Sequence, residues 1–95
     1  MILRYLVTFD IPDDATRKEL GELLEEYGLR VQRSVFELRF KSRSEYDTLL
    51  CRIRTLIDPG ADSVRFYPQC ERCAAKAQEL GDFPDPFEIG GVYYF

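Results

Sequence analysis

The spacing of apolar and polar residues at the start of the chain predicts a strand followed by a helix. Residues 2–9 are rich in β-forming residues, which is typical of a buried strand, and Asp10 ends that run. Leucines recur at helical spacing over residues 15–28, a range that closes on a glycine, a common helix stop. Asp13 and Asp14 precede this range, where a helix N-cap and first turn favour negative charge. We therefore expect a helix that begins at this aspartate pair.

Residues 29–40 form a second β-prone stretch, but their apolar positions change parity along the run. Val35 belongs to the odd positions, whereas Phe36 and Leu38 belong to the even ones. This change around Ser34 predicts a bulge or a strand that is used on both faces. The stretch is short for two hairpin strands with a turn, so the number of strands in it stays open.

The second half of the chain predicts another helix and another strand. Residues 44–58 place apolar side chains at a period of about 3.6 residues, and either Ser42 or Ser44 can cap that helix. Residues 62–68 alternate apolar and polar positions, as a half-buried strand does. A short helix is expected to follow as far as Leu80.

This order of elements favours an α+β fold, a ferredoxin-like βαββαβ sandwich. We expect residues 1–80 to form the ferredoxin-like domain and residues 81–95 to form a C-terminal extension that ends in a β-prone segment. An extra strand has no evident place in a four-stranded sheet. It can instead add to the sheet edge of a second copy, so a homodimer with a partner-swapped strand is expected.

Composition removes several classes of function. The chain of 95 residues contains no histidine, which excludes within one chain a serine–histidine triad, a histidine base and a histidine metal ligand. Gly-rich phosphate loops are absent as well. No apolar run reaches the length of about 18 residues that a membrane span needs, and the N-terminal apolar run is too short for a secretory signal. A cytoplasmic location without membrane contact is therefore expected.

Three cysteines, Cys51, Cys70 and Cys73, do not suggest a disulfide framework. We expect Cys51 to be a buried small residue on a helix face. The pair Cys70 and Cys73 is expected to pack in a tight turn beneath the short helix. Two alternatives remain open: half of a zinc site that a second chain completes, and a redox-active pair.

Asp10 is the strongest candidate for chemistry, because it is an acid at the end of an otherwise apolar strand. Active-site residues often occupy such sheet ends. The alternative is that Asp10 only caps the turn. One aspartate makes a poor Mg²⁺ site by itself, whereas two copies of Asp10 across a dimer axis would make a better one.

Charge is distributed unevenly along a chain whose net charge is −4. Residues 29–43 are predominantly basic, whereas residues 79–95 contain acids and no base. An arginine-rich strand region suits phosphate contacts, and the alternative is a solvated basic face paired with the acidic tail. The net charge argues against strong nonspecific nucleic-acid binding by a single chain.

Several segments together resemble the small CRISPR-associated adaptation proteins, the Cas-two family. The resemblance runs from Tyr5 to about Leu80. Its components are the strand that ends in Phe-Asp-Ile at residues 9–11, the Tyr-Gly helix end, and the segments Val-Gln-Arg-Ser-Val-Phe-Glu (31–37) and Asp-Ser-Val-Arg-Phe-Tyr-Pro (62–68). The family motif usually has tyrosine where this chain has Phe9, so any role of that hydroxyl is absent.

The resemblance implies a ferredoxin-like homodimer that works with the larger CRISPR integrase subunit in capturing spacer DNA. It also implies a Mg²⁺-dependent endonuclease that acts on single-stranded RNA or duplex DNA, with Asp10 as the catalytic and metal-binding residue. Arg17, Arg30 and Arg33 correspond to the family's nucleic-acid-binding residues. Not all members are catalytic, so a purely structural DNA scaffold is an alternative, as is a toxin-type RNA-cleaving relative.

Overall fold

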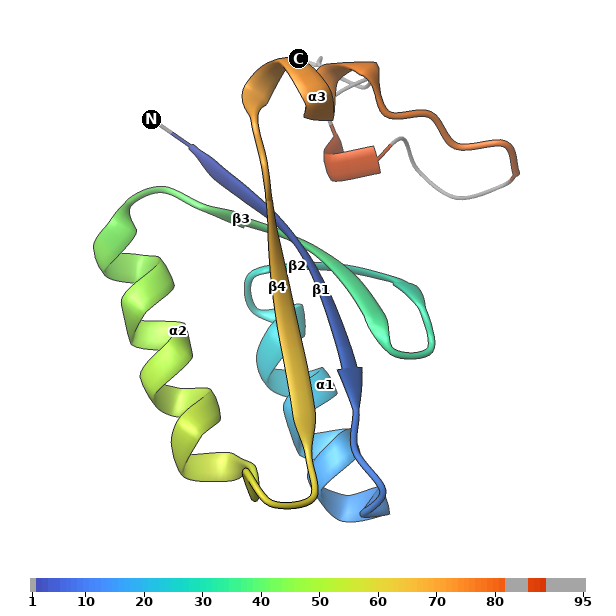
Figure 1. The fold of residues 1–95 in the computed structure, drawn as a ribbon. Helices are drawn as coiled ribbons and strands as arrows, with labels where there is room; N and C mark the ends of the chain where they lie inside the picture. Colours follow the sequence, from blue (N-terminus) through green and yellow to red (C-terminus); the bar gives the residue numbers. More distant parts are fainter. Residues whose placement is uncertain (1, 82–85, 89–95) are drawn as a thin grey trace.

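Four strands form one antiparallel sheet in the computed structural model, which describes residues 2–81 and 86–88 (Figure 1). The strands are β1 (Leu3–Asp10), β2 (Gly28–Gln32), β3 (Val35–Phe40) and β4 (Ser63–Gln69), and their order in the sheet is β2-β3-β1-β4. Helix α1 (Asp14–Glu25) joins β1 to β2, and helix α2 (Arg43–Leu56) joins β3 to β4. The short helix α3 (Glu71–Lys76) and the 3-10 turn η1 (Pro86–Glu88) follow β4. This arrangement confirms the predicted α+β, βαββαβ class.

The core lies between one face of the sheet and the helices α1 and α2. Strand alternation directs the odd residues of β1 and the even residues of β3 toward the helices. The largest fully buried side chains are Phe36, Phe40, Leu20, Leu24, Leu38, Leu49 and Val7. Tyr5 of β1 stacks on Tyr46 of α2 with ring centroids 4.4 Å apart, and this contact ties the second helix to the sheet centre.

Each long helix begins at a residue whose side chain accepts a hydrogen bond from the first turn. The Asp13 carboxylate accepts from the Thr16 N–H at 2.8 Å, and the Ser42 hydroxyl accepts from the Glu45 N–H at 3.2 Å. The Glu45 carboxylate in turn accepts from the Lys41 N–H at 2.8 Å. The N-cap at Asp13 was predicted, and Ser42 is the cap among the two serines that the sequence left open.

Residues 29–40 contain two strands rather than one. β2 and β3 pair directly, Gln32 opposes Val35, and the register shifts between Arg30 and Gln32. The predicted irregularity near Ser34 is thus a tight hairpin turn with a bulge beside it. The bulge accounts for the change of parity, and the turn itself takes up only residues 33 and 34. Twelve residues therefore suffice for both strands.

Gly28 does not end α1, contrary to the expectation of a helix stop. The helix ends at Glu25 with Glu26 as its C-cap, and Gly28 is the first residue of β2 with an ordinary negative φ. A Cβ at Gly28 would lie 2.8 Å from the Leu38 Cα and would also overlap the Glu37 carbonyl oxygen. Glycine is required here because the backbones of β2 and β3 approach closely.

The face of the sheet opposite the helices is contacted by η1. The Phe87 backbone N–H donates to the Glu37 Oε1 at 2.8 Å, and Phe87 is buried with positive φ. Figure 1 shows α3 and η1 at the end of the sheet away from the β1–α1 loop. The tail strand predicted within residues 81–95 lies outside the described residues.

Two expectations about the cysteines were wrong, the burial of Cys51 and the packing of the Cys70 and Cys73 pair, whereas all three cysteines are free, as expected. Cys51 is exposed on α2, because the buried face of that helix is formed by Leu49 and Ile53. Cys70 and Cys73 are exposed as well, so they do not pack beneath α3. Cys70 is instead the N-cap of α3, and its Sγ accepts a hydrogen bond from the Cys73 N–H at 3.2 Å. α3 also ends at Lys76, earlier than the predicted end at Leu80.

Candidate functional site

Asp10 occupies the last position of β1, between two side chains that anchor the backbone in the core. Phe9 is 6% exposed and Ile11 is 3% exposed, whereas Asp10 is exposed and opposes Ser63 of β4. Within the described part of the chain, the Asp10 carboxylate has no hydrogen bond or ion pair. The strand therefore fixes where this carboxylate emerges and leaves its oxygens available.

The β2–β3 turn lies beside Asp10. The Phe9 N–H donates to the Ser34 carbonyl oxygen at 3.1 Å, a bond outside the regular strand ladder. This bond holds the hairpin tip against the end of β1. It places Arg33 and Ser34 next to Asp10, although they are more than twenty residues away in sequence.

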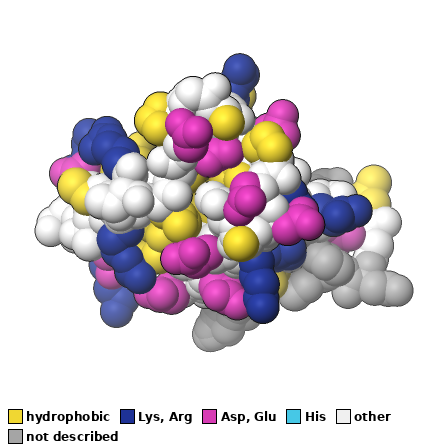
Figure 2. All heavy atoms as spheres, turned by 90° about the horizontal axis from the view of Figure 1, so that it is seen from below, with side chains coloured by type: hydrophobic (Ala, Val, Ile, Leu, Met, Phe, Trp, Pro, Cys, Tyr) yellow, Lys and Arg dark blue, Asp and Glu magenta, His cyan; other side chains and the backbone are white. Residues whose placement is uncertain are grey.

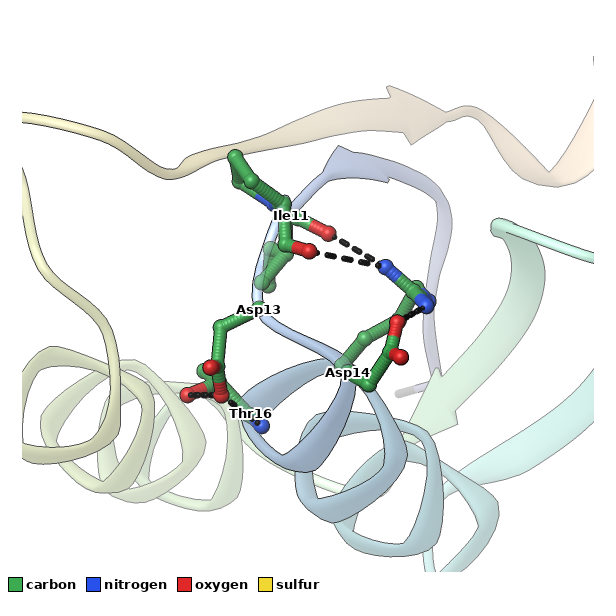
Figure 3. A network of polar contacts seen from close by, with 6 residues as sticks. Ile11, Asp13, Asp14 and Thr16 are labelled. Carbon is green, nitrogen blue, oxygen red and sulfur yellow. Dashed lines mark hydrogen bonds and ion pairs between the residues drawn. The ribbon is translucent and has the colours of Figure 1, made fainter.

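The β1–α1 loop is held by Arg17, whose contacts with Ile11 and Asp14 are among the dashed lines in Figure 3. Arg17 Nη1 donates to the carbonyl oxygens of Ile11 at 2.7 Å and Pro12 at 3.5 Å, and its other nitrogen pairs with Asp14. On the opposite side of the loop, the Thr16 backbone and hydroxyl donate to Asp13 and hold the pKa of that carboxyl below its ordinary value. Arg17, in the first turns of α1, thus has two partners in the β1–α1 loop and a third, Asp14, at the start of its own helix.

A pocket of about 530 Å³ brings the predicted residues together. Its lining includes Asp10 and Asp14 and the four cations Arg17, Lys18, Arg30 and Arg33. The four site residues predicted above, Asp10, Arg17, Arg30 and Arg33, therefore all line this pocket. Asp14, Lys18 and Ser34 also line the pocket, although none of them was predicted from the sequence as a site residue. Lys18 directly follows Arg17 at the start of α1 and could have been found from the turn of helix that it shares with that residue.

Arg30 enters the pocket from β2. Its guanidinium carbon lies 5.0 Å from the centroid of the Phe36 ring, within the range of a cation–π contact. Phe36 has no exposed surface and lies beneath this cation. Arg33, at the hairpin turn, is exposed and has no partner within the described ranges.

The pocket suits an anion that meets several cations at once. Figure 2 views the molecule from the end at which β1 terminates, and acidic and basic side chains are interspersed on that surface. Because the pocket contains four cations and two carboxylates, one of which pairs with Arg17, it carries a local positive excess. Arginine donates in a fork that matches phosphate oxygens. The arrangement can therefore bind a phosphodiester beside a carboxylate.

A metal site built from one chain is limited to few ligands. Residues 2–81 and 86–88 contain no group of three or more His, Cys, Asp or Glu side chains that could hold an ion. Mg²⁺ usually takes one or two protein carboxylates and completes its shell with water and phosphate oxygens. Asp10 fits as one such carboxylate.

No helix in the described part of the chain is long and apolar enough to cross a membrane.

Comparison with known proteins gives a consistent set of matches. Residues 1–77 match the family model described as CRISPR associated protein Cas2. CRISPR-associated endoribonuclease Cas2 3 of Synechocystis sp. is 48% identical over 84% of this chain and 86% of its own length. CRISPR-associated endonuclease Cas2 2 of Thermus thermophilus is 45% identical over 86% of this chain and 86% of its own length.

Solved structures agree with the sequence matches. The structure of Streptococcus pyogenes Cas2 superposes with a TM-score of 0.71 and 30% identity, over 82% of this chain and 99% of that one. A chain of a partial Cas6-RT-Cas1–Cas2 complex gives a TM-score of 0.70 and 34% identity, over 82% of this chain and 84% of that one. With its βαββαβ sheet and with Asp10 at the end of the first strand, this chain belongs to the Cas2 family of CRISPR-associated proteins.

Proposed function

We propose that this protein is a CRISPR adaptation protein that binds nucleic acid as a homodimer and supports the capture and integration of spacer DNA with a larger integrase subunit. The observation that carries the proposal is the pocket that gathers Arg30, Arg33 and Lys18 around Asp10. The structural match to a chain of a complex that contains Cas1 supports the choice of partner.

The cationic side chains contribute to binding in different ways. Lys18, Arg30 and Arg33 are all exposed and can meet phosphates, and Arg30 in addition lies over the Phe36 ring. Arg17 is engaged with the loop carbonyls and shapes the β1–α1 turn. Because the net charge is −4, binding depends on this local cluster and on its duplication in a dimer.

The C-terminal extension completes the proposal. Residues 81–95 would add a strand to the partner's sheet and present acidic side chains to the integrase subunit, with residues 1–80 as the folded domain. The charge asymmetry between this tail and the basic stretch 29–43 favours docking onto a basic surface.

Cleavage of nucleic acid is the second candidate function. It is favoured by the names of the relatives, an endoribonuclease and an endonuclease, and by the Asp10 carboxylate, which has no partner among the described residues. Asp10 from each of two chains would hold Mg²⁺, which when bound supplies positive charge that polarises a phosphate. Arg30 and Arg33 would orient the phosphodiester. The general base would not be a histidine, because the chain contains none.

Reconstituted spacer integration tests both functions. Four versions of the full chain are each assayed together with the cognate larger subunit: wild type, Asp10→Ala, Arg33→Ala and Glu25→Ala. Glu25→Ala is the control, because Glu25 is an acid on the exposed face of α1. We expect Arg33→Ala to reduce integration and Glu25→Ala to leave it unchanged. Integration that does not require this protein at all would overturn the proposal.

The Asp10→Ala variant separates the two candidates. Normal integration by this variant would favour a scaffold, with any cleavage incidental. If integration is lost while the variant still dimerises and binds DNA, Asp10 acts in the chemistry and the metal-dependent function becomes the leading one.

A further inference from the structure

Gly21 lies in the interior of α1, opposite the Arg30 side chain. A Cβ built at Gly21 would lie 3.5 Å from the Arg30 guanidinium carbon and would overlap its Nη2 atom. Gly21 is buried, and the residues around it in α1 are good helix formers. The missing side chain therefore opens a notch in the helix that the guanidinium of a neighbouring strand fills.

Glycine is an unfavourable choice for this position on local grounds. In a helix interior it is less stable than alanine, because it loses more backbone freedom on folding. Gly21 has an ordinary helical φ, so the backbone conformation does not demand glycine. Among the described residues, a Cβ at Gly21 would meet atoms of Arg30, so alanine would intrude on the space that this side chain occupies.

Arg30 contacts both the notch and the Phe36 ring. Its guanidinium lies 5.0 Å from the ring centroid and also lies against α1 at Gly21. These two contacts favour one orientation of the exposed Arg30 guanidinium, so less side-chain entropy is lost when it binds an anion. Arg30 is at the same time part of the pocket lining beside Asp10.

We propose that Gly21 is a positioning residue for phosphodiester recognition, because its notch clamps Arg30 over Phe36 and aims the guanidinium into the Asp10 pocket. The inference rests on the proposed nucleic-acid-binding function and adds one residue to it. Gly21 itself contacts no phosphate, and it acts through Arg30.

The test is Gly21→Ala in the full chain. The overlap involves the far end of a flexible side chain, so we expect Arg30 to swing away while the fold is kept and the melting temperature stays equal or rises. Affinity for a short random-sequence DNA duplex should fall by about five- to tenfold, the loss of one charged hydrogen bond. The slope of log affinity against log salt should fall by about one.

Two controls separate positioning from a general effect. Glu22→Ala places the same small side chain at the adjacent exposed position of α1 and should leave affinity and salt slope unchanged. The double variant Gly21→Ala/Arg30→Ala should bind no more weakly than Arg30→Ala alone, because Gly21 has nothing further to position. Additive losses would overturn the inference.

A measurement on the free protein makes the inference independent of binding. The ring current of Phe36 should shift the NMR resonances of the Arg30 Cδ protons in wild type, and Gly21→Ala should abolish that shift. A shift that survives in Gly21→Ala overturns the notch. A shift that is lost while DNA affinity is unchanged overturns the role in recognition and leaves the proposed function standing. Wild-type protein that binds neither DNA nor single-stranded RNA of equal length overturns the proposed function and this inference with it.

Discussion

Arg17 Nη1 donates a hydrogen bond of 2.7 Å to the carbonyl oxygen of Ile11, the residue directly after Asp10. The same guanidinium pairs with Asp14, so the start of α1 and the end of β1 are joined by one side chain (Figure 3). Ile11 is buried, and this bond supplies a hydrogen-bond donor to its carbonyl oxygen. The geometry of the loop behind Asp10 therefore depends on an arginine for which the family resemblance implied a role in nucleic-acid binding.

Replacing Arg17 should accordingly affect the stability of the fold more than it affects nucleic-acid binding. Arg17→Ala is expected to lower the free energy of unfolding by about 1–2 kcal/mol, because a partly buried charged hydrogen bond is lost. Arg17→Lys retains the charge but cannot reach the carbonyls and Asp14 together, so it should lose most of the same stability. Urea unfolding of both variants provides the measurement. Full stability combined with weakened DNA binding would show instead that Arg17 acts chiefly on phosphate.

Acid stability should depend on the Asp13 cap. The backbone N–H of Thr16, followed by its hydroxyl, lowers the pKa of Asp13 from the ordinary value of 3.8. Because the pKa in the folded state is the lower one, the ionised cap stabilises the fold above the unfolded pKa. That contribution is lost as pH falls through the folded pKa. Asp13→Asn keeps a good N-cap that does not titrate.

Thermal melts of wild type and Asp13→Asn between pH 3 and pH 7 would measure this dependence. The difference between their melting temperatures should be constant in the upper part of that range. Below about pH 4 it should shift in favour of the variant, because only wild type loses the charge of the cap. A difference that does not change with pH would show that the carboxylate charge at Asp13 adds nothing to the fold.

The sequence predicted those features that depend on local pattern. The leucine spacing of α1, the alternation of β4 and the aspartate cap were readable because each reports burial or capping within a few residues. Asp10, Arg30 and Arg33 were found by residue type and by family resemblance, and they do share one pocket. The pocket itself could not be predicted, because it depends on the bond from Phe9 to Ser34 across the sheet.

The roles of two glycines were also beyond the local pattern. Gly28 follows a helix closely enough to look like its stop, yet its necessity comes from backbone atoms of β3. Gly21 looks like a simple weak point in a helix, yet it faces a side chain that belongs to β2. In both positions the constraint is the close approach of a segment that is distant in sequence, which periodicity does not register.

Substitution by alanine should therefore lower the free energy of unfolding at Gly28 but not at Gly21. Gly28→Ala introduces a Cβ against the backbone of Glu37 and Leu38, which cannot rotate away, so β2 must separate from β3. We expect a loss of about 1–3 kcal/mol in the free energy of unfolding, the range for overpacking. Gly21→Ala, measured in the same denaturant series, should lose none. Equal stability of the two variants would mean that the β2–β3 pair tolerates the wider spacing.

The exposed pair Cys70 and Cys73 should titrate unequally. A hydrogen bond from the Cys73 thiol, followed by one from the Cys73 backbone N–H, lowers the pKa of the Cys70 thiol below its ordinary value of 9.0. The Cys73 pKa is raised above 9.0, first by the hydrogen bond to Cys70 and then by the nearby Cys70 charge. Thiolates are the reactive form, so alkylation at neutral pH should modify Cys70 faster than Cys73.

Alkylation with iodoacetamide over a pH series, read by mass spectrometry after tryptic cleavage, tests this order. Cleavage at Arg72 separates the two cysteines into different peptides, so each rate is measured in the intact chain. The pH midpoint of Cys70 should lie below that of Cys73. Cys73→Ser replaces the thiol donor by a hydroxyl that does not acquire the negative charge, so Cys70 should still titrate early in that variant. In Cys70→Ser the midpoint of Cys73 should fall, because the thiolate that opposes its ionisation is gone. A midpoint of Cys73 below that of Cys70 in the wild-type chain would contradict the hydrogen-bond direction at the N-cap of α3.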